Sequence, residues 1–171
     1  MKKKGQVWVE TVTYTLVAFV LIGLVLAFVK PRIDELQDKA LIEQSLGVLK
    51  KIDSIISEVY LEGPGNKRLV EVVLKKGEIS INSESDTLNF EFEGNYQYSE
   101  PGTNYKEGSF EILTTKIGPL YKVEISKSYP DFNITYEDKD IPKVLPESSV
   151  PYRVFIANRG GASQAIDFSL E

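Results

Sequence analysis

The chain contains no cysteine and no histidine among its 171 residues. Without cysteine it can form no disulfide and perform no thiol chemistry. Without histidine it lacks the commonest general base near neutral pH and the commonest metal ligand. Ser-His-Asp and Cys-His sites are excluded, and zinc and haem sites are disfavoured. The sequence also has no glycine-rich phosphate loop, no GxSxG motif and no EF-hand spacing, so we expect no enzyme, no cofactor and no metal site.

Basic charge is scarce in the C-terminal two thirds of the chain. Residues 61–171 carry twelve Lys and Arg against eighteen Asp and Glu, whereas residues 1–60 are nearly balanced. Nucleic acid calls for a basic face, and so does the anionic surface of a membrane. We therefore expect no nucleic-acid partner and regard the acidic charge as a solubilising surface.

One long apolar run lies near the N-terminus. Nineteen residues without a charge, 11–29, are enough to cross a bilayer as a helix. The run is too long for the apolar region of a secretory signal peptide, which has about 7–15 residues, and no Ala-x-Ala cleavage site follows it. Lys2 to Lys4 precede the run, while Lys30 and Arg32 follow it, so the charges favour an N-terminus inside the cell only slightly.

An ordinary membrane anchor leaves Gly5 and Glu10 unexplained. A carboxylate at the centre of a bilayer costs about 2.5–3.5 kcal/mol and less near an end, so such a group is either wet at the interface or paired. Here a lysine tract ends in Gly5, Gln6 follows it, and Glu10 stands four residues further on. This tract resembles the class III signal peptide of archaeal type IV pilins. Trp8 and Tyr14 stand where that family usually has serine and leucine.

The resemblance implies a maturation step and a role for Glu10. A membrane prepilin peptidase cleaves such chains after the glycine, here between Gly5 and Gln6, and the apolar helix becomes the assembly core of a filament. Cleavage leaves a positive amine on Gln6, about 6 Å from Glu10 along a helix axis. We hypothesise that Glu10 pairs with the Gln6 amine of a neighbouring subunit, because a paired charge in hydrocarbon costs less than an isolated one. The alternative is a contact between the two groups within one helix.

The helical pattern continues beyond the apolar run to about Tyr60. Pro31 removes a helical hydrogen bond, so we expect a kink or local opening there, with Lys30 pushed toward extended backbone. Apolar residues then recur at spacings of three and four; they are Ile33, Leu36, Ala40, Ile42, Leu46, Leu49, Ile52, Ile56 and Val59. Solvated polar positions are expected at Asp34, Asp38, Glu43, Lys50, Lys51, Asp53 and Ser54. We expect the C-terminal half of the stripe to pack on the chain's own β domain and the N-terminal half on other subunits.

From Lys67 onward the apolar period changes to two, which indicates half-buried antiparallel strands. In one of them, Phe132, Ile134 and Tyr136 alternate with residues expected on a polar face. Strands are predicted at 68–74, 78–82, 88–93, 109–114, 121–126, 132–137, 152–157 and 166–170. Lys75-Lys76-Gly77 is interpreted as a hairpin turn between the first two strands. About eight short strands with short links favour a sandwich or a small barrel.

The predicted fold class is therefore α+β, in three segments. Residues 1–5 are the leader, and residues 6–60 form a transmembrane and assembly helix that is membrane-spanning, then amphipathic, with a kink near Pro31. Residues 61–171 form an extracellular antiparallel β-sandwich. The β domain carries an N-glycosylation sequon, Asn133-Ile134-Thr135, with Asn133 expected on a polar face where a glycan could attach.

The loop 94–108 holds Tyr96, Tyr98 and Tyr105 among turn residues. Exposed tyrosines can supply adhesive contacts, but these rings would equally cover the edge of the domain. Whether these rings are exposed or packed in the folded domain therefore decides between an adhesive loop and a structural one.

The sequence favours a structural or minor subunit of an archaeal type IV pilus-like filament, cleaved after Gly5. Its expected partners are other pilin subunits of the same or another kind, which contact it through residues 6–30, the prepilin peptidase, and the membrane before assembly. It would reside in the cell membrane first, as a single-pass protein with its N-terminus inside, and then in an extracellular surface filament. The filament's role would be cell adhesion, motility or secretion. The alternative is a single-span cell-surface protein whose β-sandwich ectodomain binds a ligand or partner.

Overall fold

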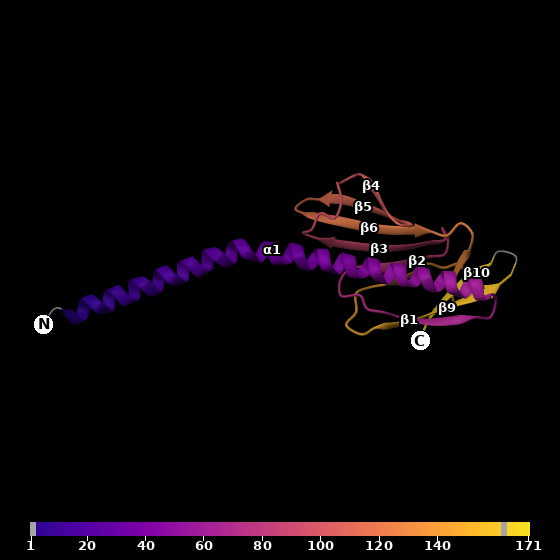
Figure 1. Ribbon diagram of the computed structural model, residues 1–171, viewed down its shortest axis with the longest axis horizontal. Helices are drawn as coiled ribbons and strands as arrows, with labels where there is room; N and C mark the ends of the chain where they lie inside the picture. Colours follow the sequence, from indigo (N-terminus) through magenta and orange to yellow (C-terminus); the bar gives the residue numbers. More distant parts are fainter. Residues whose placement is uncertain (1–2, 162–163) are drawn as a thin grey trace. The chain divides into compact units, whose positions relative to one another are not determined.

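The computed structural model describes residues 3–161 and 164–171, with side chains from Val7 onward. In that part of the chain one helix, α1 (Lys3–Glu62), precedes ten strands (Figure 1). The strands are β1 (Lys67–Val72), β2 (Glu78–Asn82), β3 (Thr87–Gly94), β4 (Asn104–Glu107), β5 (Phe110–Ile117), β6 (Leu120–Ser128), β7 (Asn133–Tyr136), β8 (Lys143–Leu145), β9 (Tyr152–Gly160) and β10 (Ala165–Leu170). All eight predicted strands are present, and the α+β class is confirmed.

The sequence did not predict β4 and β8, because neither shows a clear apolar alternation. β4 has four residues, of which the first three are exposed. β8 has only three residues, and Pro142 and Pro146 flank it. Short edge strands of this kind leave little trace in local sequence.

The chain divides into two compact units, the first ending at Gln37 and the second running from Asp38 to Glu171. Within the first unit, α1 continues through Pro31 and Lys30 is helical. The expected extended backbone at Lys30 and the local opening are therefore wrong, because the hydrogen bonds of the neighbouring turns hold the helix where proline removes one donor. A kink at Pro31 stays a prediction.

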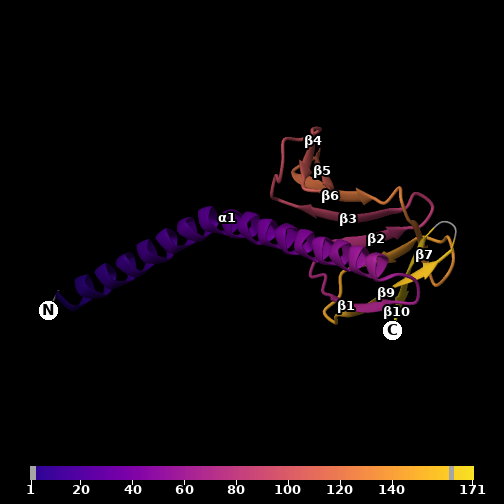
Figure 2. The ribbon, with the colours of Figure 1, turned by 45° about the vertical axis from the view of Figure 1, so that its right-hand side comes forward.

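The strands of the second unit form two sheets. The four-stranded sheet has the order β1-β9-β10-β7, and the six-stranded sheet has the order β4-β5-β6-β3-β2-β8. The pairing is antiparallel as predicted, except that β7 and β10 are parallel, with Ile134 opposite Ile166. The predominantly antiparallel, two-sheet arrangement is visible in Figures 1 and 2.

The predicted hairpin at Lys75-Lys76-Gly77 is wrong. β1 pairs with β9, while β2 pairs with β3 and β8 in the other sheet. The chain turns here, with Gly77 at a φ of +82°, but it crosses from one sheet to the other. Val70 and Ile79 both face the core, but they reach it from opposite sheets.

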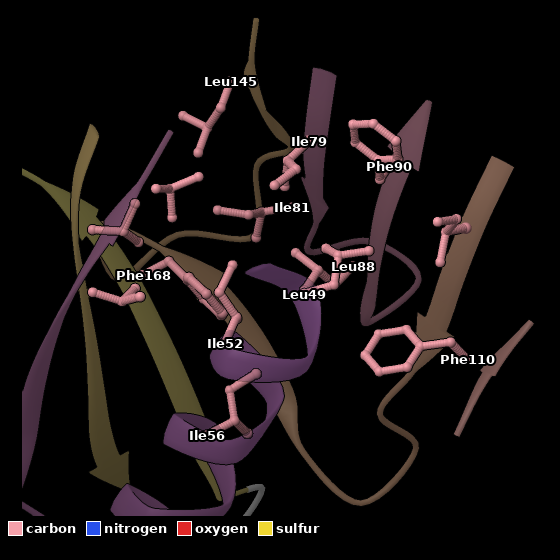
Figure 3. Close-up of a cluster of buried hydrophobic side chains, with 14 of the residues drawn as sticks. Leu49, Ile52, Ile56, Ile79, Ile81, Leu88, Phe90, Phe110, Leu145 and Phe168 are labelled. Atoms are coloured by element: carbon pink, nitrogen blue, oxygen red, sulfur yellow. The ribbon is translucent and has the colours of Figure 1, made fainter. Parts of the chain in front are cut away.

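A single hydrophobic core joins both sheets to residues 42–59 of α1. The predicted stripe is confirmed here, since Ile42, Leu46, Leu49, Ile52, Ile56 and Val59 are buried. Figure 3 shows Leu49, Ile52 and Ile56 pointing from the helix into the space between the sheets, with Phe168 on one side and Phe110 on the other. The upstream positions Ile33 and Leu36 are exposed.

The expectation of a solvated helix face is wrong at Asp38 and Asp53. Asp38 is only 5% exposed. One of its carboxylate oxygens accepts a hydrogen bond of 2.6 Å from the Asn95 backbone N–H, and the other lies 3.0 Å from the Lys76 ammonium. Asp53 is half-buried, pairs with Lys127 and accepts a hydrogen bond of 3.1 Å from the Tyr129 hydroxyl. Both carboxylates therefore fasten the helix to polar groups of the β domain.

Candidate functional site

The apolar part of α1, residues 7–29, is the candidate functional site. Its large side chains are exposed in the structure, among them Trp8, Phe19 and Phe28, which are 70%, 68% and 78% exposed. The helix contains an 18-residue window with a mean hydropathy of 2.6, so it is long and apolar enough to span a membrane. An apolar surface of this extent is stable only in lipid or against other apolar surfaces.

The threonines of this segment satisfy their own hydrogen-bonding needs. The hydroxyls of Thr11, Thr13 and Thr15 each donate to the backbone carbonyl four residues earlier, at 2.8–2.9 Å. These polar side chains can therefore enter an apolar environment without an outside partner.

Glu10 is different, because an ionised carboxylate only accepts hydrogen bonds. It is the one charged residue between Val7 and Val29, and the surrounding helix uses its backbone N–H groups for its own hydrogen bonds. Glu10 therefore needs a donor that the neighbouring helical backbone cannot supply. Water, a second chain and the terminal amine of a processed chain are all capable of supplying one.

The predicted leader lies at the edge of what the structure describes. Residues 1 and 2 are outside the described residues, as are the side chains of residues 3–6. The backbone of Gly5 and Gln6 is helical, so Gln6 and Glu10 are four residues apart on one helix, about 6 Å along its axis. Cleavage between Gly5 and Gln6 and the pairing of Glu10 stay predictions.

The sequon of the β domain is split between two environments. Asn133 is half-buried at the start of β7, but Thr135 is buried, so the predicted polar face is wrong at Thr135. The Thr135 hydroxyl donates a hydrogen bond of 2.9 Å to a carboxylate oxygen of Asp167, a residue that is 1% exposed. The same oxygen accepts the Asp138 backbone N–H at 2.7 Å. The turn after β7 thus folds over this face and removes it from solvent.

An arginine balances the buried Asp167 carboxylate. The Arg159 guanidinium lies 2.9 Å from Asp167 and 2.8 Å from Asp138. Asp138 occupies left-handed backbone at a φ of 58°, which aspartate tolerates better than most residues. Asp138 is therefore a turn residue whose carboxylate is held by an arginine.

The tyrosines of loop 94–108 differ in burial, as the residues of the sequon do. Tyr96 and Tyr98 pack against the core, whereas Tyr105, on β4, is 49% exposed. The Tyr98 hydroxyl donates a 3.0 Å hydrogen bond to Glu107, and burial together with this carboxylate raises the pKa of Tyr98. Of the three rings, Tyr105 is the most available for contact with a partner.

Sequence reasoning missed one further site. Tyr60 at the end of α1 and Phe132 before β7 meet edge to face, with ring centroids 4.8 Å apart. They line a hollow of about 650 Å³ together with Asp86, Asp131 and Asn133. Tyr60 and Asp86 lie far in sequence from residues 131–133, so no local motif could have placed all of them together.

Comparison of the chain with protein-family models, curated proteins and solved structures gives no match. The function is therefore inferred from the residues and the geometry of this chain itself.

Proposed function

We propose that the protein is a structural or minor subunit of an archaeal type IV pilus-like surface filament. In this proposal a prepilin peptidase cuts the chain after Gly5, and residues 6–30 leave the membrane to form the filament core. The β domain is extracellular throughout. The uncovered apolar face of residues 7–29, with a lone carboxylate at Glu10, is the observation that supports this proposal.

A helix meant only to anchor a domain in lipid gains nothing from a carboxylate. Charged residues within membrane segments are rare and usually have a partner. A filament core provides one, because each new subunit brings an amine to a neighbour's carboxylate. The pairing would also select one axial register, as buried polar groups do in coiled coils.

The decisive experiment is the intact mass and N-terminal sequence of the protein from its native membrane and surface fractions, with electron microscopy of the surface fraction. We expect a chain that begins at Gln6 and filaments that contain it. A chain that retains Lys2 to Gly5 would overturn the proposal in favour of a single-span surface protein. A cyclised Gln6 would have no charged amine, so Glu10 would need another partner.

Two glycine variants make this test specific. Gly5→Val is expected to block cleavage, because the new side chain lies at the scissile bond. Gly23→Val is the matched control, since Gly23 lies in the middle of the apolar run, and cleavage should proceed normally. Equal cleavage of both variants would contradict a cut after Gly5.

A further inference from the structure

The hollow beside Tyr60 and Phe132 is lined by aromatic rings and by polar side chains. Tyr60 is 37% exposed, while Phe132 packs against the core. The hollow is therefore bordered by one exposed ring and one ring that packs on the core. Its position at the C-terminal end of α1 places it far along the chain from the candidate assembly segment.

The polar lining of the hollow offers hydrogen-bonding groups of the kind that sugars use. Asp86 and Asp131 contribute carboxylates, and Asn133 contributes an amide. One Asp86 oxygen accepts the Ile134 backbone N–H at 2.7 Å, which fixes this carboxylate in place. The C–H face of a pyranose stacks on aromatic rings, and its hydroxyls donate to carboxylates. The chemistry of the hollow thus suits a carbohydrate.

A glycan attached covalently to Asn133 would lie next to this hollow. Asn133 lines the hollow and is the acceptor position of the sequon Asn133-Ile134-Thr135. We propose that Asn133 carries an N-linked glycan whose first sugars lie in the hollow that Tyr60 and Phe132 line. This inference does not depend on filament assembly, because the β domain is extracellular in either a filament subunit or a single-span surface protein.

The modification is a glycosyl transfer from a lipid-linked phosphate donor. A bond forms between the Asn133 side-chain nitrogen and C1 of the first sugar. The bond between C1 and the donor phosphate oxygen breaks, the lipid phosphate leaves with the electron pair, and the amide loses one proton. No oxidant or reductant is needed.

The structure also sets the order of events. The transferase reads the hydroxyl residue of the sequon, and in the folded domain the Thr135 hydroxyl is buried and bonded to Asp167. Transfer must therefore precede the pairing of β7 with β10. Once folded, an unmodified domain would no longer be a substrate.

The first test is mass spectrometry of the protein from the native surface fraction, compared with plasmid-borne variants in the same cells. We expect a glycan mass on the peptide that contains Asn133, its loss in Asn133→Gln and Thr135→Val, and its retention in Thr135→Ser. Thr135→Val keeps Asn133 and the buried volume at position 135. It therefore shows whether loss of the sequon alone, without loss of the Asn133 side chain, removes the glycan. An unmodified Asn133 peptide in the wild type would overturn the proposal.

The second test asks where the sugars lie. In NMR spectra of the glycosylated full chain in detergent, protons of the first sugar should be shifted upfield by the Tyr60 ring. Tyr60→Leu should abolish this shift, while Tyr105→Leu, at an exposed tyrosine of β4, should leave it unchanged. Sugar resonances that are identical in wild type and Tyr60→Leu would mean that the glycan projects into solvent, and the proposed placement would be wrong.

Discussion

Asp38 marks the residue at which α1 begins to pack on the β domain. It lies four residues before Ile42 and eight before Leu46, on the line of the buried stripe. Its carboxylate occupies the space beside Gly94, where an added Cβ would lie 2.5 Å from a carboxylate oxygen. A charged residue on an apolar line is thus a partnered anchor, because burial without a partner would be costly.

Replacing Asp38 should therefore destabilise the domain. Asp38→Ala removes a charged acceptor from the Asn95 backbone N–H and from Lys76, and we expect a loss of about 2–3 kcal/mol in the free energy of unfolding. Glu43→Ala, at an exposed position of the same helix, should change it by less than about 0.5 kcal/mol. Urea denaturation of the full chain in detergent measures both. Equal losses would show that the Asp38 contacts do not stabilise the fold.

Tyr129 should make the stability of the domain sensitive to alkaline pH. Burial, with the nearby Asp53 carboxylate as a second cause, raises the pKa of the Tyr129 hydroxyl above its ordinary value, even though the Lys127 ammonium also lies close to the ring. The folded state thus favours the neutral phenol. The contribution of the neutral Tyr129 phenol to the free energy of unfolding is complete below about pH 10. It declines as the pH rises from there toward the folded-state pKa.

The pH dependence can be measured as the urea midpoint between pH 8 and pH 11. We expect the wild-type midpoint to fall more steeply above pH 10 than that of Tyr129→Phe, which has no hydroxyl to ionise. Tyr105→Phe, at an exposed tyrosine, should retain the wild-type slope. A wild-type slope in Tyr129→Phe would assign the alkaline loss to other groups.

At the scale of elements, α1 serves two purposes along one continuous helix. Residues 42–59 present an apolar stripe to the core, whereas residues 7–29 expose apolar side chains on all sides. A helix that is apolar all round belongs in a membrane or among other helices, and one with a stripe belongs on a domain surface. The polar and charged residues from Lys30 onward mark the change between these two kinds of helix.

Leucine truncation should separate the two purposes. Leu49 is fully buried, so Leu49→Ala should lower the free energy of unfolding by about 2–5 kcal/mol. Leu24 is 52% exposed in the apolar segment, so Leu24→Ala should leave the stability of the domain unchanged. Thermal unfolding in detergent would show the difference, and a large shift in Leu24→Ala would mean that this segment packs on its own domain.

At the scale of the whole molecule, the proposed filament depends on Glu10. Glu10→Gln keeps the size and most of the polarity of the side chain but removes its charge. If the carboxylate pairs with the Gln6 amine of a neighbour, this variant should be cleaved after Gly5 yet fail to form filaments. Glu43→Gln is the control with the charge removed outside the apolar run, and it should assemble normally.

Immunoblots of processed chain and electron microscopy of the cell surface give the two readouts. Filaments of normal abundance from Glu10→Gln would exclude the pairing. Loss of cleavage in that variant would instead place Glu10 in peptidase recognition.

Much of the fold could be predicted from local sequence, since all eight predicted strands and the buried helix stripe are present. Three of the failures share one cause. The turn at Lys75-Lys76-Gly77 is real but joins two sheets, Thr135 follows an alternating pattern but lies under a turn, and Asp38 is charged but buried. In each case a contact from elsewhere in the chain overrides the local pattern. The candidate assembly segment was found from sequence alone, because length and apolarity need no tertiary information.

The sequence by itself determined the apolar helix, its single carboxylate, the change of period from helix to strand, and the absence of histidine and cysteine chemistry. These properties depend on the order and kind of neighbouring residues. Only the tertiary structure decided which strands pair, that Asp38 meets Asn95, and that Tyr60 meets Phe132 beside Asn133. The physical reason is that such contacts join residues tens of positions apart, and their energies exist only once the core has brought the two sheets and the helix together.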